Sequence, residues 1–181
     1  MKTVRLVAIL FLALATACGI SRRSPQERQA EALRIQQMLD SRAYTIDINY
    51  MIPLRGGGKS VSTYSLSVNR DTLDSHLPYR GEARMIPYGG GKGLNFQERI
   101  SSYTDSGLSS DKRTVTIAVK NDEDSYVYTL TVFDNGDADI HVHCGNRDDI
   151  SYRGSVRRND GEETVYGILG QVGFGLYHLA H

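Results

Sequence analysis

Polar and apolar residues alternate along most of the chain from residue 44 onward. In the first such segment, Tyr44, Ile46 and Ile48 alternate with Thr45 and Asp47. Successive side chains of a strand point to opposite faces, so this pattern predicts strands with one buried face. Further segments of this kind predict more strands: residues 63–68, Glu82–Ile86, Leu94–Ile100, 114–119, Tyr126–Phe133, Ala138–Cys144, and a last strand around Ile150, Tyr152 and Val156.

Short polar turns join these segments. Asn135-Gly136 stands between two of the predicted strands, and both residues accept positive φ, which is the strongest local signal for a hairpin. Strand after strand with short turns is typical of an antiparallel meander. The fold class is therefore mainly β: a single antiparallel β-sandwich or barrel-like meander. The 181 residues of the chain suffice for one domain with a hydrophobic core.

A helix is expected ahead of the strands. Ser24-Pro25-Gln26-Glu27 combines a capping residue, a proline for the first turn and a glutamate that completes a capping box. The predicted order is a helix over 25–40, a β domain over 44–158 and a Gly-rich, apolar tail over 159–181. That tail is too short and too broken by glycine to span a membrane.

The N-terminal segment carries an export signal. Lys2 and Arg5 precede the apolar run Leu6–Leu14, and Ala15-Thr16-Ala17 supplies the small residues of a cleavage site. We expect residues 1–17 to be a signal peptide and 18–24 a linker.

Cys18 stands directly after the cleavage site. Leu14-Ala-Thr-Ala-Cys18 resembles a bacterial lipobox, although Ala15 occupies a position that usually holds Leu. We expect the Cys18 thiol to be acylated, which holds a chain at a membrane. The alternative is ordinary cleavage that leaves Cys18 free or paired with Cys144.

Charge excludes one class of partner. The chain has 21 basic and 21 acidic residues, and its Arg22-Arg23 and Arg157-Arg158 pairs are isolated. A near-neutral chain without a basic stripe is not expected to bind nucleic acid. No cofactor is expected either.

Several short stretches carry a family resemblance, and they occur in this order: Pro53, Tyr64–Val68 (YSLSV), Leu77–Gly81 (LPYRG), Gly93–Phe96 (GLNF), Asn146-Arg147 and Ile150–Gly154 (ISYRG). Together they resemble the family catalogued as domain of unknown function 4251, small envelope lipoproteins typical of Bacteroidota. The resemblance covers residues 44–156 and implies the fold and an envelope location. It carries over no catalytic or binding residue. The segment after Cys18 lacks the acidic run that often directs such lipoproteins to the surface, so a periplasm-facing orientation is favoured.

Two weak candidate sites remain. His141 and His143 share one strand face with Asp139 and form a possible metal pair, with a further ligand from His76 or from an acidic residue elsewhere. The alternative is a solvated polar face. Two tyrosines that follow prolines near glycine runs, Tyr79 and Tyr88, suit a ligand surface, and structural packing is the alternative there.

Other motifs fail on spacing. The glycine run before Lys59-Ser60 has Pro53 where a phosphate loop needs its first glycine. Asp134–Asp139 suggests a calcium loop, but Gly145 stands where the bidentate glutamate belongs. Asp74-Ser75-His76 are adjacent, whereas a catalytic triad must converge through space.

The leading hypothesis is an exported, lipid-anchored envelope protein that binds a small ligand or a protein partner. The rival is a hydrolase or metal-dependent enzyme acting on envelope polymers. A structural role, with the apolar tail as a docking segment, is a third possibility.

Overall fold

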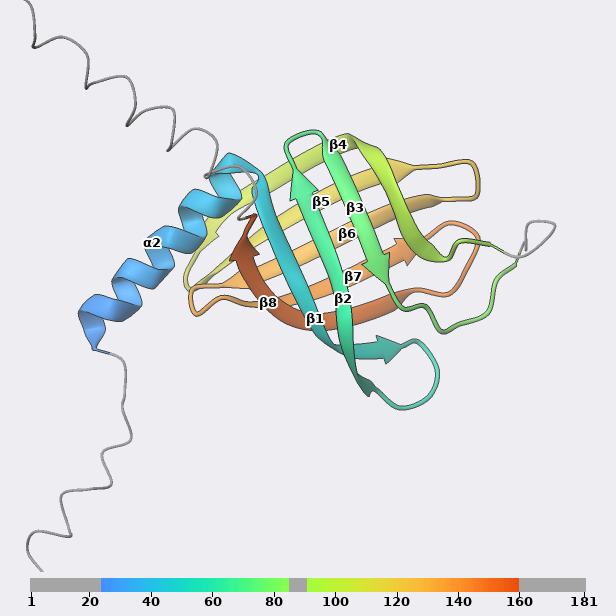
Figure 1. Cartoon of the computed structure of the whole chain (residues 1–181), viewed down its shortest axis with the longest axis horizontal. Helices are drawn as coiled ribbons and strands as arrows, with labels where there is room; N and C mark the ends of the chain where they lie inside the picture. Colours follow the sequence, from blue (N-terminus) through green and yellow to red (C-terminus); the bar gives the residue numbers. More distant parts are fainter. Residues whose placement is uncertain (1–23, 85–90, 160–181) are drawn as a thin grey trace, which may run out of the picture.

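The structure is a computed structural model that describes residues 24–84 and 91–159. Each strand pairs antiparallel with the next, and the last strand pairs with the first, so the sheet closes into a barrel (Figure 1). The elements are α2 (Pro25–Ser41), β1 (Ala43–Pro53), β2 (Lys59–Asn69), β3 (Thr72–Leu77), β4 (Leu94–Ser109), β5 (Lys112–Lys120), β6 (Ser125–Phe133), β7 (Asp137–Cys144) and β8 (Ile150–Arg158).

Pairing between β1 and β8 decides the choice between the two predicted architectures. Ile46 of β1 lies opposite Val156 of β8, which closes the sheet as a barrel, not a sandwich. Two strand predictions need correction. Residues 82–84 hold only an isolated bridge between Ala83 and Arg147, so the described part of Glu82–Ile86 is not a strand. The strand predicted over Leu94–Ile100 is the first part of the longer β4.

One strand, β3, was not predicted. Its buried residues Leu73, Ser75 and Leu77 alternate with more exposed ones. The run is only six residues long and one of its buried positions is a serine, so its apolar pattern is weak. Ser75 lies inside the barrel, where it donates a hydrogen bond to the carbonyl of Leu94 at 2.8 Å. The prediction that Asp74, Ser75 and His76 form no triad is consistent with this place in a strand.

The helix α2 begins as its sequence predicts. The Ser24 hydroxyl accepts from the backbone N–H of Glu27, and the Glu27 carboxylate accepts from the backbone N–H of Ser24. Only the last turns of the helix are buried, at Ile35, Met38 and Leu39, which cover one end of the barrel. The first turns project away from the barrel (Figure 1). Within the described ranges, no helix is long and apolar enough to cross a membrane.

Side chains fill the interior of the barrel. Tyr44, Tyr126, Tyr128 and Tyr152 are at most 1% exposed, and aliphatic residues from all eight strands pack around them. An eight-stranded barrel is just wide enough either for such a packed interior or for one small ligand. Here the bulky tyrosines take that space, so the interior is a core.

The predicted signal peptide, Cys18, Tyr88 and residues 160–181 lie outside the described residues.

Candidate functional site

Tyr79 lies in the connection between β3 and β4, at the barrel end opposite α2. Its hydroxyl donates to the backbone carbonyls of Asp148, at 3.0 Å, and Glu82, at 3.3 Å. A Cβ added at Gly81 would lie 2.5 Å from that hydroxyl, so the glycine makes room for the ring. Burial raises the pKa of Tyr79 to about 12. These contacts assign Tyr79 a packing role, and its ligand-binding role stays a prediction.

The two YRG stretches meet at the same end of the barrel. Tyr152, from the second stretch, is buried and donates from its hydroxyl to the carbonyl of Pro78, in the first, at 2.7 Å. A Cβ at Gly154 would overlap the backbone carbonyl oxygen of Asp47 on β1. Tyr152 therefore ties the second stretch to the β3–β4 connection that carries the first, and Gly154 allows β8 to lie close to β1 where the barrel closes.

Arg147 holds the neighbouring turns together. Its side chain is 7% exposed, and its guanidinium lies 3.4 Å from the carboxylates of both Glu123 and Asp124, which are also buried. The guanidinium also lies over the rings of Tyr79 and Tyr126, at 5.5 and 5.8 Å. The Nε atom is buried and makes no hydrogen bond, although it is in ion-pair range of Asp124. This cluster is a structural clasp that links the β3–β4 connection to the β5–β6 and β7–β8 turns.

His141 and His143 lie on the outer face of β7, as their alternation predicts, and both are exposed. Asp149 is the acid next to them: His143 Nδ1 lies 3.0 Å from both of its carboxylate oxygens, and His141 Nε2 lies 3.6 Å from one. Burial raises the pKa of Asp149, but hydrogen bonds from His143 and the backbone N–H of Cys144 outweigh it, and the net pKa is lowered. Asp139 pairs instead with Arg153, at 3.5 Å.

No group of three or more His, Cys, Asp or Glu side chains in residues 24–84 and 91–159 is placed to hold a metal ion. Asp149 is thus close to both histidines without completing a ligand set. The Asp134–Asp139 run, which suggests a calcium loop in the sequence, likewise supplies no set of metal ligands among the described residues. There Asn135 donates from its side-chain amide to Asp137 at 2.7 Å and accepts from the backbone N–H of Asp137 at 3.1 Å, which makes it a hairpin turn.

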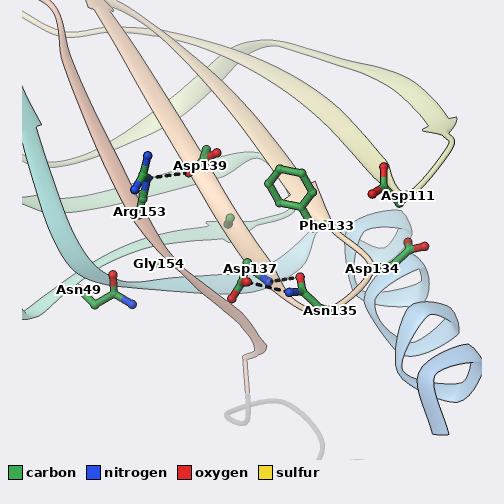
Figure 2. Close-up of a pocket in the computed structure, with 10 residues that line it drawn as sticks. Asn49, Asp111, Phe133, Asp134, Asn135, Asp137, Asp139, Arg153 and Gly154 are labelled. Atoms are coloured by element: carbon green, nitrogen blue, oxygen red, sulfur yellow. Dashed lines mark hydrogen bonds and ion pairs between the residues drawn. The ribbon is translucent and has the colours of Figure 1, made fainter. Parts of the chain in front are cut away.

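A hollow of about 650 Å³ lies on the outer wall of the barrel (Figure 2). Its walls come from a β-bulge in β1, from β8 and from the β6–β7 turn, with the Asp139–Arg153 ion pair on one side. Asn49 is the extra residue of that bulge, and this places its amide in the hollow. The residues that line it are Asn49, Asp111, Phe133, Asp134, Asn135, Asp137, Ala138, Asp139, Arg153 and Gly154.

Two smaller hollows adjoin the first. One of about 270 Å³ shares Asp139 and Arg153 with it and extends along β7 and β8 to His141. Another of about 360 Å³ shares Asp134 and Asn135 with it and lies between the β6–β7 turn and the first turns of α2. The three hollows adjoin one another through these shared lining residues, and together we call them the outer groove. It runs from His141, past the Asp139–Arg153 pair, to Arg28 of α2.

The sequence pattern of the family described as Domain of unknown function (DUF4251) matches residues 26–156. The chain belongs to the DUF4251 family. Its fold is also similar to a crystal structure of a DUF4251 family protein from Bacteroides eggerthii DSM 20697, with a TM-score of 0.56 and 14% identity, over 76% of this chain and 94% of that one. No curated protein matches this chain. The family membership and the fold implied by the short stretches are confirmed, whereas the lipoprotein anchor and the envelope location stay predictions.

In this DUF4251 chain the outer groove was not predicted from the sequence. Asp134, Asp137 and Asp139 belong to the run interpreted above as a turn with a calcium-loop alternative, whereas Asp111 and Glu31 come from the β4–β5 turn and α2. Asn49 and Arg153 come from the first and last strands, and they reach the groove only because the barrel closes. A period-two pattern does mark Asp137, Asp139 and Arg153 as outward-facing, and that was the available signal.

Proposed function

We propose that this DUF4251 protein is an exported, lipid-anchored envelope protein that acts as a binding module, with its ligand in the outer groove. The observation that supports this binding site is the difference between the inside of the barrel, which is packed, and its outside, which is hollowed. Tyrosines and aliphatic side chains occupy the interior, whereas three adjoining hollows lie outside it, two on the outer wall and one between the β6–β7 turn and α2. Ligand sites are concave and combine a few well-placed polar groups, and hollows of 300–1,000 Å³ are typical of them.

The chemistry of the outer groove suits a polar ligand. The carboxylates of Asp134 and Asp137 and the side-chain amide of Asn135 line the groove at the β6–β7 turn, the Asp139–Arg153 ion pair lines it farther along, and Phe133 adds one aromatic ring. Such a set offers hydrogen-bond donors and acceptors in addition to apolar contact. A small polar molecule or a polar segment of an envelope protein fits this lining better than an acyl chain does.

Anchoring rests on the sequence alone. Cys18 follows a signal peptide and precedes a short linker to α2, and acylation of this thiol would place the barrel beside a membrane. We expect Cys18→Ser to move the protein from the membrane fraction to the soluble fraction, and unchanged partitioning would refute the anchor. Protease treatment of intact cells tests the proposed periplasm-facing orientation, which predicts protection.

A photo-crosslinking amino acid tests the outer groove in living cells. Asn49 in the groove and Gln97 on the exposed face of β4 are matched sites, since both are exposed side-chain amides on barrel strands. Crosslinked products are expected from position 49 and not from position 97. Two substitutions to arginine check the result. Asn49→Arg should reduce ligand capture by the detergent-solubilised protein, whereas Gln97→Arg should leave it unchanged. Equal crosslinking from both positions would contradict the proposal.

The rival, a metal-dependent enzyme, has one specific observation in its favour. Asp149 contacts His143 and lies within 3.6 Å of His141, so one carboxylate lies near both imidazoles, although these three side chains are not placed to hold one ion in the described residues. Titration with zinc or copper, compared with a His141→Ala, His143→Ala double variant, distinguishes the two functions. Tight binding that the double variant loses would favour the enzyme, and equal weak binding in both chains would remove it.

A further inference from the structure

The helix α2 forms one wall of the outer groove but is attached to the barrel only near its C-terminal end. Arg28, Gln29, Glu31 and Ala32 line the hollow that faces the β6–β7 turn. The buried contacts of the helix lie later, from Ile35 onward. The part of α2 that lines the groove is therefore not the part that is packed.

The apolar attachment of α2 consists of Ile35, Met38 and Leu39, and Ile35 is the one nearest the groove-lining turns. Ile35 packs on the β6–β7 turn, where a Cβ at Gly136 would lie 3.7 Å from its Cδ1 atom. Gln29 lies six residues before Ile35, and at 1.5 Å per residue this is a lever of about 9 Å. A tilt of about 20° over this length would move Gln29 by about 3 Å. Such a shift would change the width of the hollow by the size of an atom or more.

A second attachment fixes the tilt. Arg113 of β5 contacts the Asp105 carboxylate on β4 through Nε and an Nη atom, and its other contacts reach α2: Asp40 at 2.6 Å and the carbonyl of Gln36 at 3.4 Å. Its side chain is only 14% exposed, and an arginine fork held by a carboxylate in this way has a defined direction. Arg113 therefore ties the last turn of the helix to two strands at a point separate from Ile35.

We propose that α2 is an adjustable wall of the outer groove and that Arg113 is the positioning residue that sets its tilt. The inference rests on the proposed function for the role of the groove, but the position of the helix is measurable without any ligand. Because α2 directly follows the linker to Cys18, a change of tilt would also connect the anchored end of the chain to the groove.

Spin-label distances test this inference in the full-length chain that carries Cys18→Ser. Labels at Ala30 on α2 and at Gln97 on β4 report the helix position, and the buried Cys144 stays unlabelled. Arg113→Ala should shift or broaden the distance distribution by about 3 Å. The matched control is Arg157→Ala, which removes an ion pair on the outer wall that does not touch α2.

Asp40→Ala covers the case in which Arg113→Ala does not fold. It removes only the exposed helix-side partner and keeps the Arg113–Asp105 pair. The same broadening, smaller in size, is expected. Distributions that match the parent chain in every folded variant would overturn the inference, and they would do so whether or not position 49 crosslinks a ligand. A shift in Arg157→Ala equal to that in the helix-side variants would overturn it too.

Discussion

Removal of Arg147 is expected to destabilise the barrel more than removal of a closer ion pair on its surface. Arg147→Ala would leave the Glu123 and Asp124 carboxylates, 8% and 1% exposed, without their cation. Breaking a buried pair by removing one partner typically costs about 3–5 kcal/mol, because the remaining charge stays desolvated. Arg157 and Asp47 are only 2.6 Å apart, but both are half exposed, and such pairs contribute about 0.2–1 kcal/mol.

Urea unfolding of the full-length Cys18→Ser chain, followed by circular dichroism, measures the difference. With a slope of about 2 kcal/mol per molar urea, Arg147→Ala should lower the midpoint by about 1.5–2.5 M, whereas Arg157→Ala should lower it by at most about 0.5 M. The reasoning treats burial, not separation, as decisive. Equal shifts for the two variants, or a larger one for Arg157→Ala, would refute it.

Three further predictions concern single groups. Burial raises the pKa of the Cys144 thiol to about 12, so iodoacetamide should modify Cys144 at pH 8 only when the chain unfolds. Rapid labelling of the folded chain would contradict the burial of this thiol in the core. The hydrogen bonds from Arg113 lower the pKa of Asp105, so this carboxyl stabilises the fold above its unfolded pKa of about 3.9 and loses that contribution as the pH falls through its lower folded pKa. Asp105→Asn should therefore reduce the fall of the urea midpoint between pH 5 and pH 2. A fall as steep as in the parent chain would contradict this. Gly154→Ala forces a methyl group onto a backbone carbonyl and should cost about 1–3 kcal/mol in urea unfolding, whereas Gly57→Ala, with open space around it, should cost less than about 1 kcal/mol; equal costs would argue against the close approach of β8 to β1.

Local pattern accounts for most of the strands but not for their closure. The alternation in Tyr126–Phe133 and Ala138–Cys144, with Asn135-Gly136 between them, predicts the β6–β7 hairpin that the structure contains. Pairing of Ile46 with Val156 joins segments that lie 110 residues apart, and no local signal encodes it. This is why the sequence left sandwich and barrel open, although the strand count and turn lengths suited both.

The candidate site depends on that same closure. Alternation correctly places His141 and His143 on the outer face, because it needs only the local period. The outer groove joins Asn49 to Arg153, and their proximity follows from a bulge and from the β1–β8 pairing. Bulges shift the register by one residue and leave little trace in a single sequence, so the groove appears only in three dimensions.

The family stretches are explained by structure more than by ligand chemistry. Tyr79 in the first stretch and Tyr152 in the second each donate a hydrogen bond from the hydroxyl to a backbone carbonyl. These two family stretches therefore fix the connections at one end of the barrel. The groove lies on the outer wall, where the second stretch contributes Ser151, Tyr152, Arg153 and Gly154 and the first contributes no lining residue.

The location of the ligand on the outer wall is the central claim, and amide spectra of the isotopically labelled full-length Cys18→Ser chain test it most directly. A solubilised bacterial envelope extract serves as the titrant. The account predicts shifts that concentrate at Asn49, Asp137 and Arg153, with the barrel interior unchanged. Shifts that concentrate instead around Tyr79 and Arg147, at the opposite end of the barrel, would contradict it.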